Sequence, residues 1–257
     1  MTAKGRVERS LRATIAYDGS RYFGWQWQPD RPTVQGEVEA ALEPIAGKPV
    51  RVVASGRTDT GVHAVGQVVG FRMATRLDLT TLRRAWNAHL PDDIAVREVA
   101  AAPEGFDPVR HAVSKRYRYT IQDGSIRDVL NRHLVWWIPR RLDVVAMRCA
   151  ARWLLGEHDF AAFETSGSRR VSTVRRVTDL IVERQATGVW DRVVIEVESN
   201  GFLYNMVRNI VGTLMVVGVG KERPEWVADV LASRDRRRAG PTAPPQGLCL
   251  LSVRYRT

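Results

Sequence analysis

The spacing of apolar residues divides the first half of the chain into short strands and two amphipathic helices. Apolar positions that alternate with polar ones indicate a strand, and apolar positions three or four residues apart indicate a helix. The helices are expected to begin at Thr33 and Thr80 and to end near Gly47 and before Pro91. Strands are expected at residues 11–18, 50–55, 64–73 and 94–99. This β-α-β-β-α-β order is typical of ferredoxin-like and RNA-recognition folds.

The second half repeats this order without repeating the sequence. Strands are expected at residues 115–122, 133–138, 173–184, 189–198 and 248–254, and helices at 142–155, 202–219 and 225–231. The sequence therefore predicts an α+β fold of two RRM/ferredoxin-like halves, whose antiparallel sheets meet around a central active-site cleft. We place the first half at residues 1–106 and the second at residues 107–257.

A ten-residue turn, "SGRTDTGVHA" from Ser55 to Ala64, separates two of the expected strands. Asp59 follows a strand end and stands near Gly61, so we expect its carboxylate to project from the sheet edge into a cleft. Taken alone, an Asp in such a turn most often stabilises its own loop. Asp-Thr-Gly is also the triplet of aspartic proteases, but their chemistry needs two carboxylates that share a proton. The sequence contains no second triplet of this kind.

The charge balance points to a polyanionic partner. The 257 residues include 39 Lys and Arg against 28 Asp and Glu, a net charge of +11. Basic side chains that contact phosphates release condensed counterions, which favours nucleic-acid binding. The pairs and triplets of arginines in the expected loops and strand ends are candidates for these contacts: Arg169, Arg170, Arg175, Arg176, Arg236, Arg237 and Arg238.

Other classes of protein find little support in the composition. Cys149 and Cys249 form no CxxC motif, and no two histidines are four residues apart, so we expect neither a disulfide framework nor a zinc site. The first ten residues lack the apolar segment of a secretion signal, and a cytoplasmic protein is expected. The apolar stretch 202–220 contains Arg208 and two asparagines, which predicts a buried helix rather than a membrane span.

Together with its neighbours, the turn resembles the catalytic motif of the tRNA pseudouridine synthase A family. The resemblance runs along nearly the whole chain, through Phe23-Gly24-Trp25-Gln26, Thr33-Val34-Gln35-Gly36, Leu90-Pro91-Asp92-Asp93-Ile94, Lys115-Arg116-Tyr117-Arg118-Tyr119, His158-Asp159-Phe160, residues 201–209 and residues 239–245. One departure concerns a Phe-x-Ala-Arg pattern of the family. Here the chain reads Phe106-Asp107-Pro108-Val109-Arg110, and no role is assigned to Val109 or Arg110.

The resemblance implies an isomerase that converts uridine to pseudouridine in the anticodon stem-loop of tRNA, at positions 38, 39 and 40, without a metal or other cofactor. It makes Asp59 the nucleophile. The first step is left open between attack at C1′, attack at C6 and removal of a ribose proton. The resemblance also implies a homodimer, with one tRNA spanning both subunits.

Two arginines are candidate partners of this carboxylate. Arg208 carries the one charge between residues 202 and 220, and an arginine in an apolar helix is usually paired. We predict that it pairs with Asp59 and keeps the acid ionised; pairing with another carboxylate or a surface position is the alternative. Arg57 is a candidate for pairing with Asp59, for binding phosphate, or for holding open the stack from which the uridine is extracted.

Aromatic residues supply candidate stacking surfaces. Tyr117 and Tyr119 share one face of a strand, a position that usually belongs to a core. By resemblance, Tyr117 stacks on the target base and takes part in moving the C5 proton, whereas Tyr119 is assigned to the core. Trp25 and Trp27 suit either nucleotide stacking or a lid over the core. Thr58 and His63, in the same motif as Arg57, are expected to join Arg57 and Tyr117 in binding the substrate.

Two other functions were compared with this one. A non-catalytic RNA-binding or chaperone protein of the same fold would share the charge and the strands, but would not need Asp59. An RNA methyltransferase lacks support, because no glycine-rich loop follows a strand as its nucleotide cofactor would need.

Overall fold

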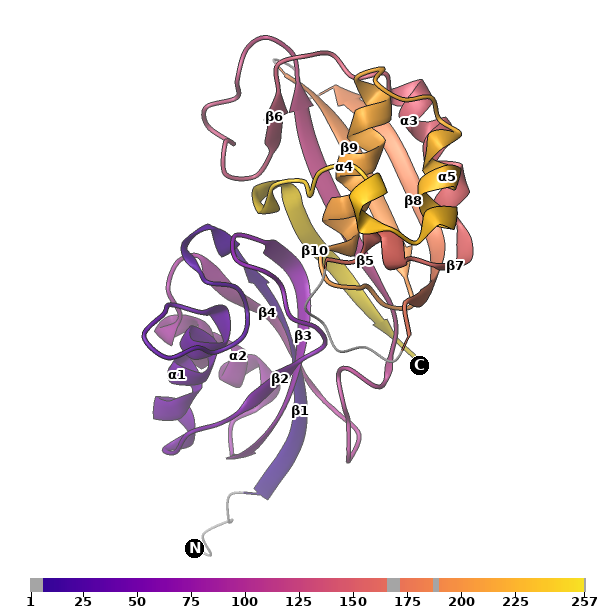
Figure 1. Ribbon diagram of the computed structural model, residues 1–257. Helices are drawn as coiled ribbons and strands as arrows, with labels where there is room; N and C mark the ends of the chain where they lie inside the picture. Colours follow the sequence, from indigo (N-terminus) through magenta and orange to yellow (C-terminus); the bar gives the residue numbers. More distant parts are fainter. Residues whose placement is uncertain (1–6, 166–171, 187–189, 257) are drawn as a thin grey trace, which may run out of the picture. The chain divides into compact units, whose positions relative to one another are not determined.

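A computed structural model describes residues 7–165, 172–186 and 190–256. The chain forms two compact units, which we call unit one (Met1–Val113 with Leu250–Thr257) and unit two (Ser114–Cys249). The described residues make a mixed α+β fold of ten strands and five α-helices, drawn in Figure 1. Each unit is described below by itself.

Unit one follows the element order expected from the sequence. Its elements are β1 (Val7–Tyr17), α1 (Val34–Ala46), β2 (Val52–Ala54), β3 (His63–Thr75), α2 (Leu79–His89) and β4 (Ile94–Ala101). Strand β1 pairs antiparallel with both β3 and β4, and β2 pairs antiparallel with β3. The two helices pack against the sheet; the ring centroids of Phe71 on β3 and Trp86 on α2 are 5.3 Å apart.

The helix ends in unit one show one agreement with expectation and one correction. Thr33 caps α1, because its hydroxyl accepts a hydrogen bond from the Gly36 amide, and Gly47 ends the helix in the left-handed conformation (φ 73°). The expected cap of α2, Thr80, is wrong. Asp78 caps this helix by accepting from the amide of Thr81, and Thr80 lies inside the first turn. A carboxylate two residues earlier caps the helix, which therefore begins earlier than expected.

Unit two contains more strands than the sequence predicts. Its strands are β5 (Ala112–Asp123), β6 (Trp136–Ile138), β7 (Gly156–Asp159), β8 (Val174–Ala186) and β9 (Asp191–Ser199), and β10 (Leu248–Tyr255) begins here and continues into unit one. The antiparallel pairs are β5 with β9, β9 with β8 and β8 with β7, whereas β6 lies parallel to β5. Strand β7 was not expected, because its four residues show no apolar alternation and form a strand only by pairing with β8.

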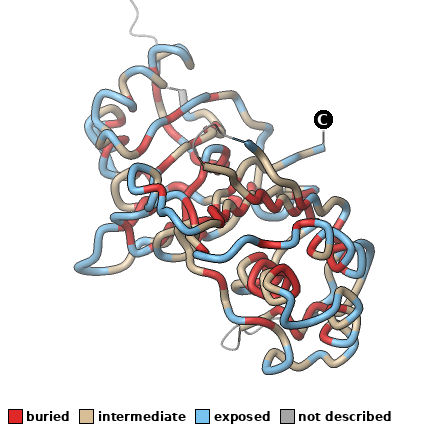
Figure 2. The backbone as a smooth tube through the Cα atoms, turned by 90° about the horizontal axis from the view of Figure 1, so that it is seen from above, coloured by how far each residue is buried: buried red, intermediate tan, exposed pale blue. Residues whose placement is uncertain are grey.

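The helices of unit two are α3 (Val144–Ala151), α4 (Met206–Gly218) and α5 (Trp226–Ser233). Helix α3 is shorter than the expected 142–155, because the chain passes into a 3₁₀ turn at Arg152–Leu154. Helix α4 forms the centre of this unit, since ten of its thirteen residues are buried. Figure 2 colours the backbone by this burial.

Candidate active site

The turn that carries Asp59 is a loop of residues 55–62 between β2 and β3. Asp59 is half-buried, whereas Arg57 is exposed. Gly61 adopts a left-handed conformation (φ 76°), which lets the loop turn so that the Val62 amide donates to the carbonyl oxygen of Asp59 at 3.1 Å. The loop therefore closes on itself directly after the acid.

Two glycines of the preceding segment hold this loop by close backbone approach. A Cβ atom on Gly19 would lie 2.0 Å from the carbonyl oxygen of Val62, and one on Gly24 would lie 2.8 Å from that of Thr58. The neighbouring amide of Trp25 donates to the Thr58 carbonyl at 3.0 Å. The Phe23-Gly24-Trp25 motif thus packs against the loop. Trp25 is buried and belongs to the core, while Trp27 is half-exposed.

His63 ties the end of the loop to the same segment. The buried ring places Nδ1 3.0 Å from the Gly19 amide and 3.1 Å from Oδ1 of Asp18. The Gly19 amide donates to this nitrogen, which holds the ring against the segment before α1. Burial raises the pKa of the Asp18 carboxyl, but hydrogen bonds from Ser20 together with the His63 ring outweigh burial and lower it overall.

Tyr117 and Tyr119, both on β5 of unit two, lie in different surroundings. Tyr117 is buried at the level of 8% exposure, and its ring meets Phe202 edge-on with centroids 5.1 Å apart. Tyr119 is fully buried and donates its phenol proton to the carbonyl oxygen of Pro244 at 2.7 Å. Burial raises the pKa of the Tyr119 phenol, and the positive charge of Arg208 opposes the rise. The assignment of Tyr119 to the core is confirmed.

Arg208 lies in the first turn of α4 with its guanidinium held by neighbours. Its Nε donates to the carbonyl oxygen of Ala243 at 2.7 Å, and its Nη1 donates to Oδ1 of Asn205 at 2.8 Å. The Ala243 amide in turn donates to the Arg208 carbonyl at 3.1 Å. These contacts orient the planar guanidinium from two sides.

The segment 239–243 is attached to α4 by backbone contact. A Cβ atom on Gly212 would lie 1.6 Å from the carbonyl oxygen of Pro241, and one on Gly240 would lie 2.5 Å from that of Gly212. The Gly240 amide donates to the hydroxyl of Thr213 at 3.0 Å. These contacts hold the segment against the helix, with Ala243 beside Arg208.

One candidate phosphate-binding arginine has a structural role instead. Arg236 is half-buried and donates to the carbonyl oxygen of Gly240 and to the side chains of Asn209 and Thr242. Burial lowers the pKa of its guanidinium. Arg237 is exposed and pairs with Asp235. Arg169 and Arg170 lie outside the described residues.

The candidate site residues are divided between the two units. Asp59, Arg57, Thr58 and His63 belong to one loop and its end in unit one, and Tyr117 and Arg208 belong to unit two. Their expected roles in the chemistry stay predictions.

Sequence reasoning missed two residues that contact the Asp59 loop, Tyr17 and Gln67. Both are buried, and their contacts are given below. A glutamine in the middle of the apolar strand expected at 64–73 was the available signal, because a buried amide must find partners for its hydrogen bonds.

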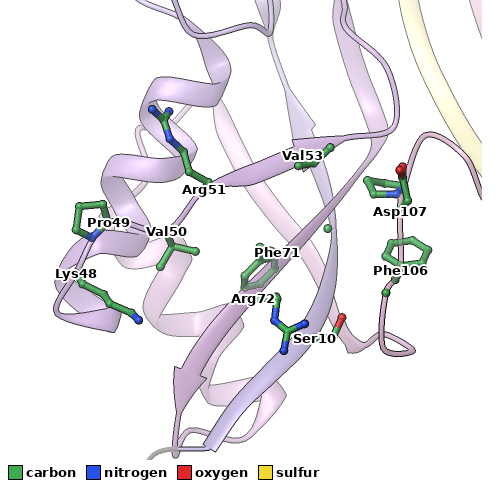
Figure 3. A pocket seen from close by; sticks show the side chains of 13 residues that line it. Ser10, Lys48, Pro49, Val50, Arg51, Val53, Phe71, Arg72, Phe106 and Asp107 are labelled. Atoms are coloured by element: carbon green, nitrogen blue, oxygen red, sulfur yellow. The ribbon is translucent and has the colours of Figure 1, made fainter.

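One pocket of unit one lies away from the Asp59 loop. A cavity of about 450 Å³ lies between residues 48–53 and residues 105–108, and no residue of the 55–62 loop lines it; Figure 3 shows its side chains. Arg51 on its wall pairs with Glu39, and Arg72 pairs with Glu104. Both arginines of this pocket therefore already face carboxylates.

Within the described ranges, no group of three or more His, Cys, Asp or Glu side chains is placed to hold a metal ion. Among these same residues, no helix is both long enough and apolar enough to cross a membrane.

Comparison with known proteins gives a match along almost the whole chain. A family model described as tRNA pseudouridine synthase matches residues 13–109 and 150–256. Proteins called tRNA pseudouridine synthase A are similar to the chain: that of Geotalea uraniireducens is 45% identical over 96% of this chain and 100% of its own length. The Myxococcus xanthus protein is 46% identical over 96% of this chain and 92% of its own. That of Thermoanaerobacter sp. strain X514 is 43% identical, with coverages of 96% and 100%.

Proposed function

The chain belongs to the tRNA pseudouridine synthase family, a family of isomerases, and from this premise we propose that it converts uridine to pseudouridine in tRNA. The observation that carries the proposal is the match to the family along almost the whole chain. It is combined with a single carboxylate, Asp59, in a loop that is held by backbone contacts at Thr58 and at Val62. The net charge of +11 favours a polyanionic substrate.

Asp59 is the proposed nucleophile. The uracil base leaves the sugar at N1, turns, and rejoins it through C5; the C5 proton passes to solvent and N1 gains a proton. An ionised carboxylate assists by attack at C1′, by attack at C6, or by removing a ribose proton. Uridine and pseudouridine have the same atoms and the same oxidation state, so we propose that no cofactor takes part.

Two side chains of unit two complete the proposed catalytic set. Arg208 pairs with Asp59 and keeps it ionised, a role that its oriented guanidinium suits. Tyr117 stacks on the target base and takes part in moving the C5 proton. The edge-on packing of its ring against Phe202 supports this role, because it fixes the plane on which a base would lie.

The proposed substrate is the anticodon stem-loop of tRNA, at positions 38, 39 and 40. Arg57 is exposed beside the acid and suits a phosphate or the opened base stack. Thr58 and His63 are proposed to bind the substrate with it, although in this structure both also hold the loop.

The proposal also covers the fold and the oligomeric state. We propose two RRM/ferredoxin-like halves, divided after residue 106, whose sheets meet around the active-site cleft. The antiparallel pairing of β1 with β3 and β4, and of β2 with β3, supports this for the first half. A homodimer in the cytoplasm, with one tRNA spanning both subunits, is proposed from the family.

The decisive experiment uses tRNA labelled with tritium at uridine C5, because C5 must lose its hydrogen when it becomes the glycosidic carbon. The wild-type protein should release tritium to water without added cofactor and in the presence of EDTA. Asp59→Ala and Asp59→Asn should release none. Both should still retard tRNA on a gel, since phosphate contacts dominate affinity.

The matched control is Asp229→Asn, which makes the same chemical change at an exposed position on α5. It should release tritium at the wild-type rate. Release by Asp59→Asn at the wild-type rate would remove Asp59 from the chemistry. Tight tRNA binding by a wild-type protein that releases no tritium would favour a non-catalytic RNA-binding protein.

A further inference from the structure

We propose that Tyr17 and Gln67 are positioning residues, which set where the Asp59 carboxylate is presented to the nucleoside. The inference rests on the proposed catalytic role of Asp59. Neither side chain belongs to the 55–62 loop, yet each reaches it from a neighbouring strand of unit one: Tyr17 ends β1, and Gln67 lies within β3.

Gln67 joins the loop at its beginning. Its side-chain oxygen accepts a hydrogen bond from the hydroxyl of Ser55 at 2.8 Å, and its side-chain nitrogen donates to the carbonyl oxygen of Gly56 at 2.8 Å. The residue is fully buried. A buried amide is tolerated where its donors and acceptor are satisfied, and here two of its bonds go to the first two residues of the loop.

Tyr17 joins the loop immediately before the acid. Its phenol oxygen lies 2.8 Å from the hydroxyl of Thr58, and both side chains are buried. The side-chain nitrogen of Gln67 lies 3.5 Å from the same phenol oxygen, so the two residues form one connected group. Hydroxyls and amides buried together in this way have little freedom to exchange partners.

The connected group bears on the acid because it contacts the loop at Ser55, Gly56 and Thr58, the residues that lead to Asp59. The Ser55 amide continues the sheet by donating to Val68, and the Thr58 carbonyl accepts from Trp25, but residues 55–62 belong to no strand. Catalytic groups must be held close to their productive geometry, and a displacement of about 1 Å can cost roughly 100-fold in rate. We therefore assign to Tyr17 and Gln67 the placing of the peptide that bears Asp59.

The test compares Tyr17→Phe and Gln67→Met with wild type in the tritium-release assay. Each variant removes hydrogen bonds to the loop and keeps a side chain of similar volume. We expect kcat to fall about 10- to 100-fold with KM unchanged within about twofold. Hydrogen exchange of peptides covering residues 17–25 and 55–62 should become faster in both variants.

Tyr22→Phe is the matched control. It also removes a phenol hydrogen bond from a buried tyrosine of unit one, but this bond is to Asp93 rather than to the loop. It should leave kcat and exchange of residues 55–62 unchanged. A fall in kcat equal to that of Tyr17→Phe would mean that loss of stability, rather than placement of Asp59, explains the effect.

A variant at Thr58 distinguishes a positioning role of Tyr17 from a role in substrate binding. Thr58→Val removes the hydroxyl that meets Tyr17 and should lower kcat as much as Tyr17→Phe does. The double variant Tyr17→Phe with Thr58→Val should lose little more than either single one, because both partners of one bond are then apolar. A rise in KM with constant kcat would overturn the positioning role.

The exchange measurement also keeps this inference distinct from the proposed function. If the wild type releases no tritium, the proposed catalysis is wrong, and unchanged exchange of the loop in Tyr17→Phe would show separately that the contacts do not hold it. If the wild type is active and Tyr17→Phe keeps kcat within about twofold, catalysis stands and the positioning role is overturned.

Discussion

Gly19 and Val62 approach so closely that a Cβ atom on the glycine would lie 2.0 Å from the valine carbonyl oxygen. The contact is between two backbones, so no side-chain rotation can relieve it. The Asp59 loop can lie this close to residue 19 because glycine has no side chain. Hydrogen bonds from Tyr17 and Gln67 hold the loop at other points.

Gly19→Ala should displace the loop and lower both stability and activity. Forcing a methyl group into packed surroundings typically costs about 1–3 kcal/mol, and thermal unfolding with tritium release measures both effects. Gly201→Ala is the control, because its new methyl group would meet the Arg175 side chain at an ordinary 3.6 Å. Equal loss in the two variants would contradict the close approach.

Arg208→Lys should lose about tenfold or more in kcat although it retains the positive charge. Lysine cannot donate to the Ala243 carbonyl and the Asn205 side chain from one rigid plane, as the guanidinium does. Single-turnover kinetics measures the change, with Arg208→Met as the variant without charge. Full activity of the lysine variant would show that charge alone suffices.

Arg236 and Arg237 are adjacent in sequence, but their substitution by alanine should affect the melting temperature differently. Arg236→Ala should lower the melting temperature, because it breaks contacts with Gly240, Asn209 and Thr242. Arg237→Ala removes a side chain that is 90% exposed, and should leave the melting temperature unchanged. If Arg237 contacts phosphate, its loss reduces the salt dependence of tRNA binding by about one unit of slope. Equal melting temperatures of the two variants would contradict the structural role of Arg236.

Asp123 of unit two should contribute to the acid sensitivity of the protein. Burial raises the pKa of this carboxyl, but the pair with Arg184, at 2.7 and 2.9 Å, and the Leu142 amide outweigh burial and lower it overall. A lowered folded-state pKa stabilises the protein above the unfolded value of about 3.9. The contribution is lost as the pH falls from there through the folded-state pKa.

Asp123→Asn tests this relation by thermal unfolding between pH 3 and pH 7. The variant should be less stable at pH 7 by roughly 3 kcal/mol, because it removes the nearer and fully buried of the two carboxylates at Arg184 and leaves Asp191, at 3.9 Å. Its stability should also change less than that of wild type as the pH falls below 4. Parallel pH profiles of the two proteins would contradict the assignment.

The elements that the sequence predicts well are those with strong apolar periodicity. Strand β3 and helix α1 lie within two residues of their expected bounds, because each has a strong apolar pattern. Strand β1 and helix α4 exist as expected, but β1 begins at Val7 rather than residue 11, and α4 begins at Met206 rather than residue 202. Strand β7 was missed, since its formation depends on pairing with β8 rather than on its own residues. The cap of α2 was misplaced because Asp78 and Thr80 are both good capping residues.

The surroundings of Asp59 could be predicted only in part. The motif identifies the acid, but the link between Tyr17 and Gln67 depends on strand register: Ile15 of β1 faces Gln67, and Tyr17 faces Ala64 across an irregularity in the pairing. An extra residue at such a point re-aims the side chains beside it. The local sequence does not predict this irregularity. Likewise, one partner of Arg236, Asn209, lies 27 positions away in the chain.

Unit one is assembled from both ends of the polypeptide, residues 1–113 and 250–257. Its last portion includes Leu251, whose carbonyl oxygen would lie 2.1 Å from a Cβ atom on Gly66 of β3. During translation, all of unit two is synthesised before that portion exists. Unit one therefore cannot complete its fold until unit two has been synthesised. Nascent chains halted before residue 250 would expose an unpaired edge of β3 to chaperones and proteases.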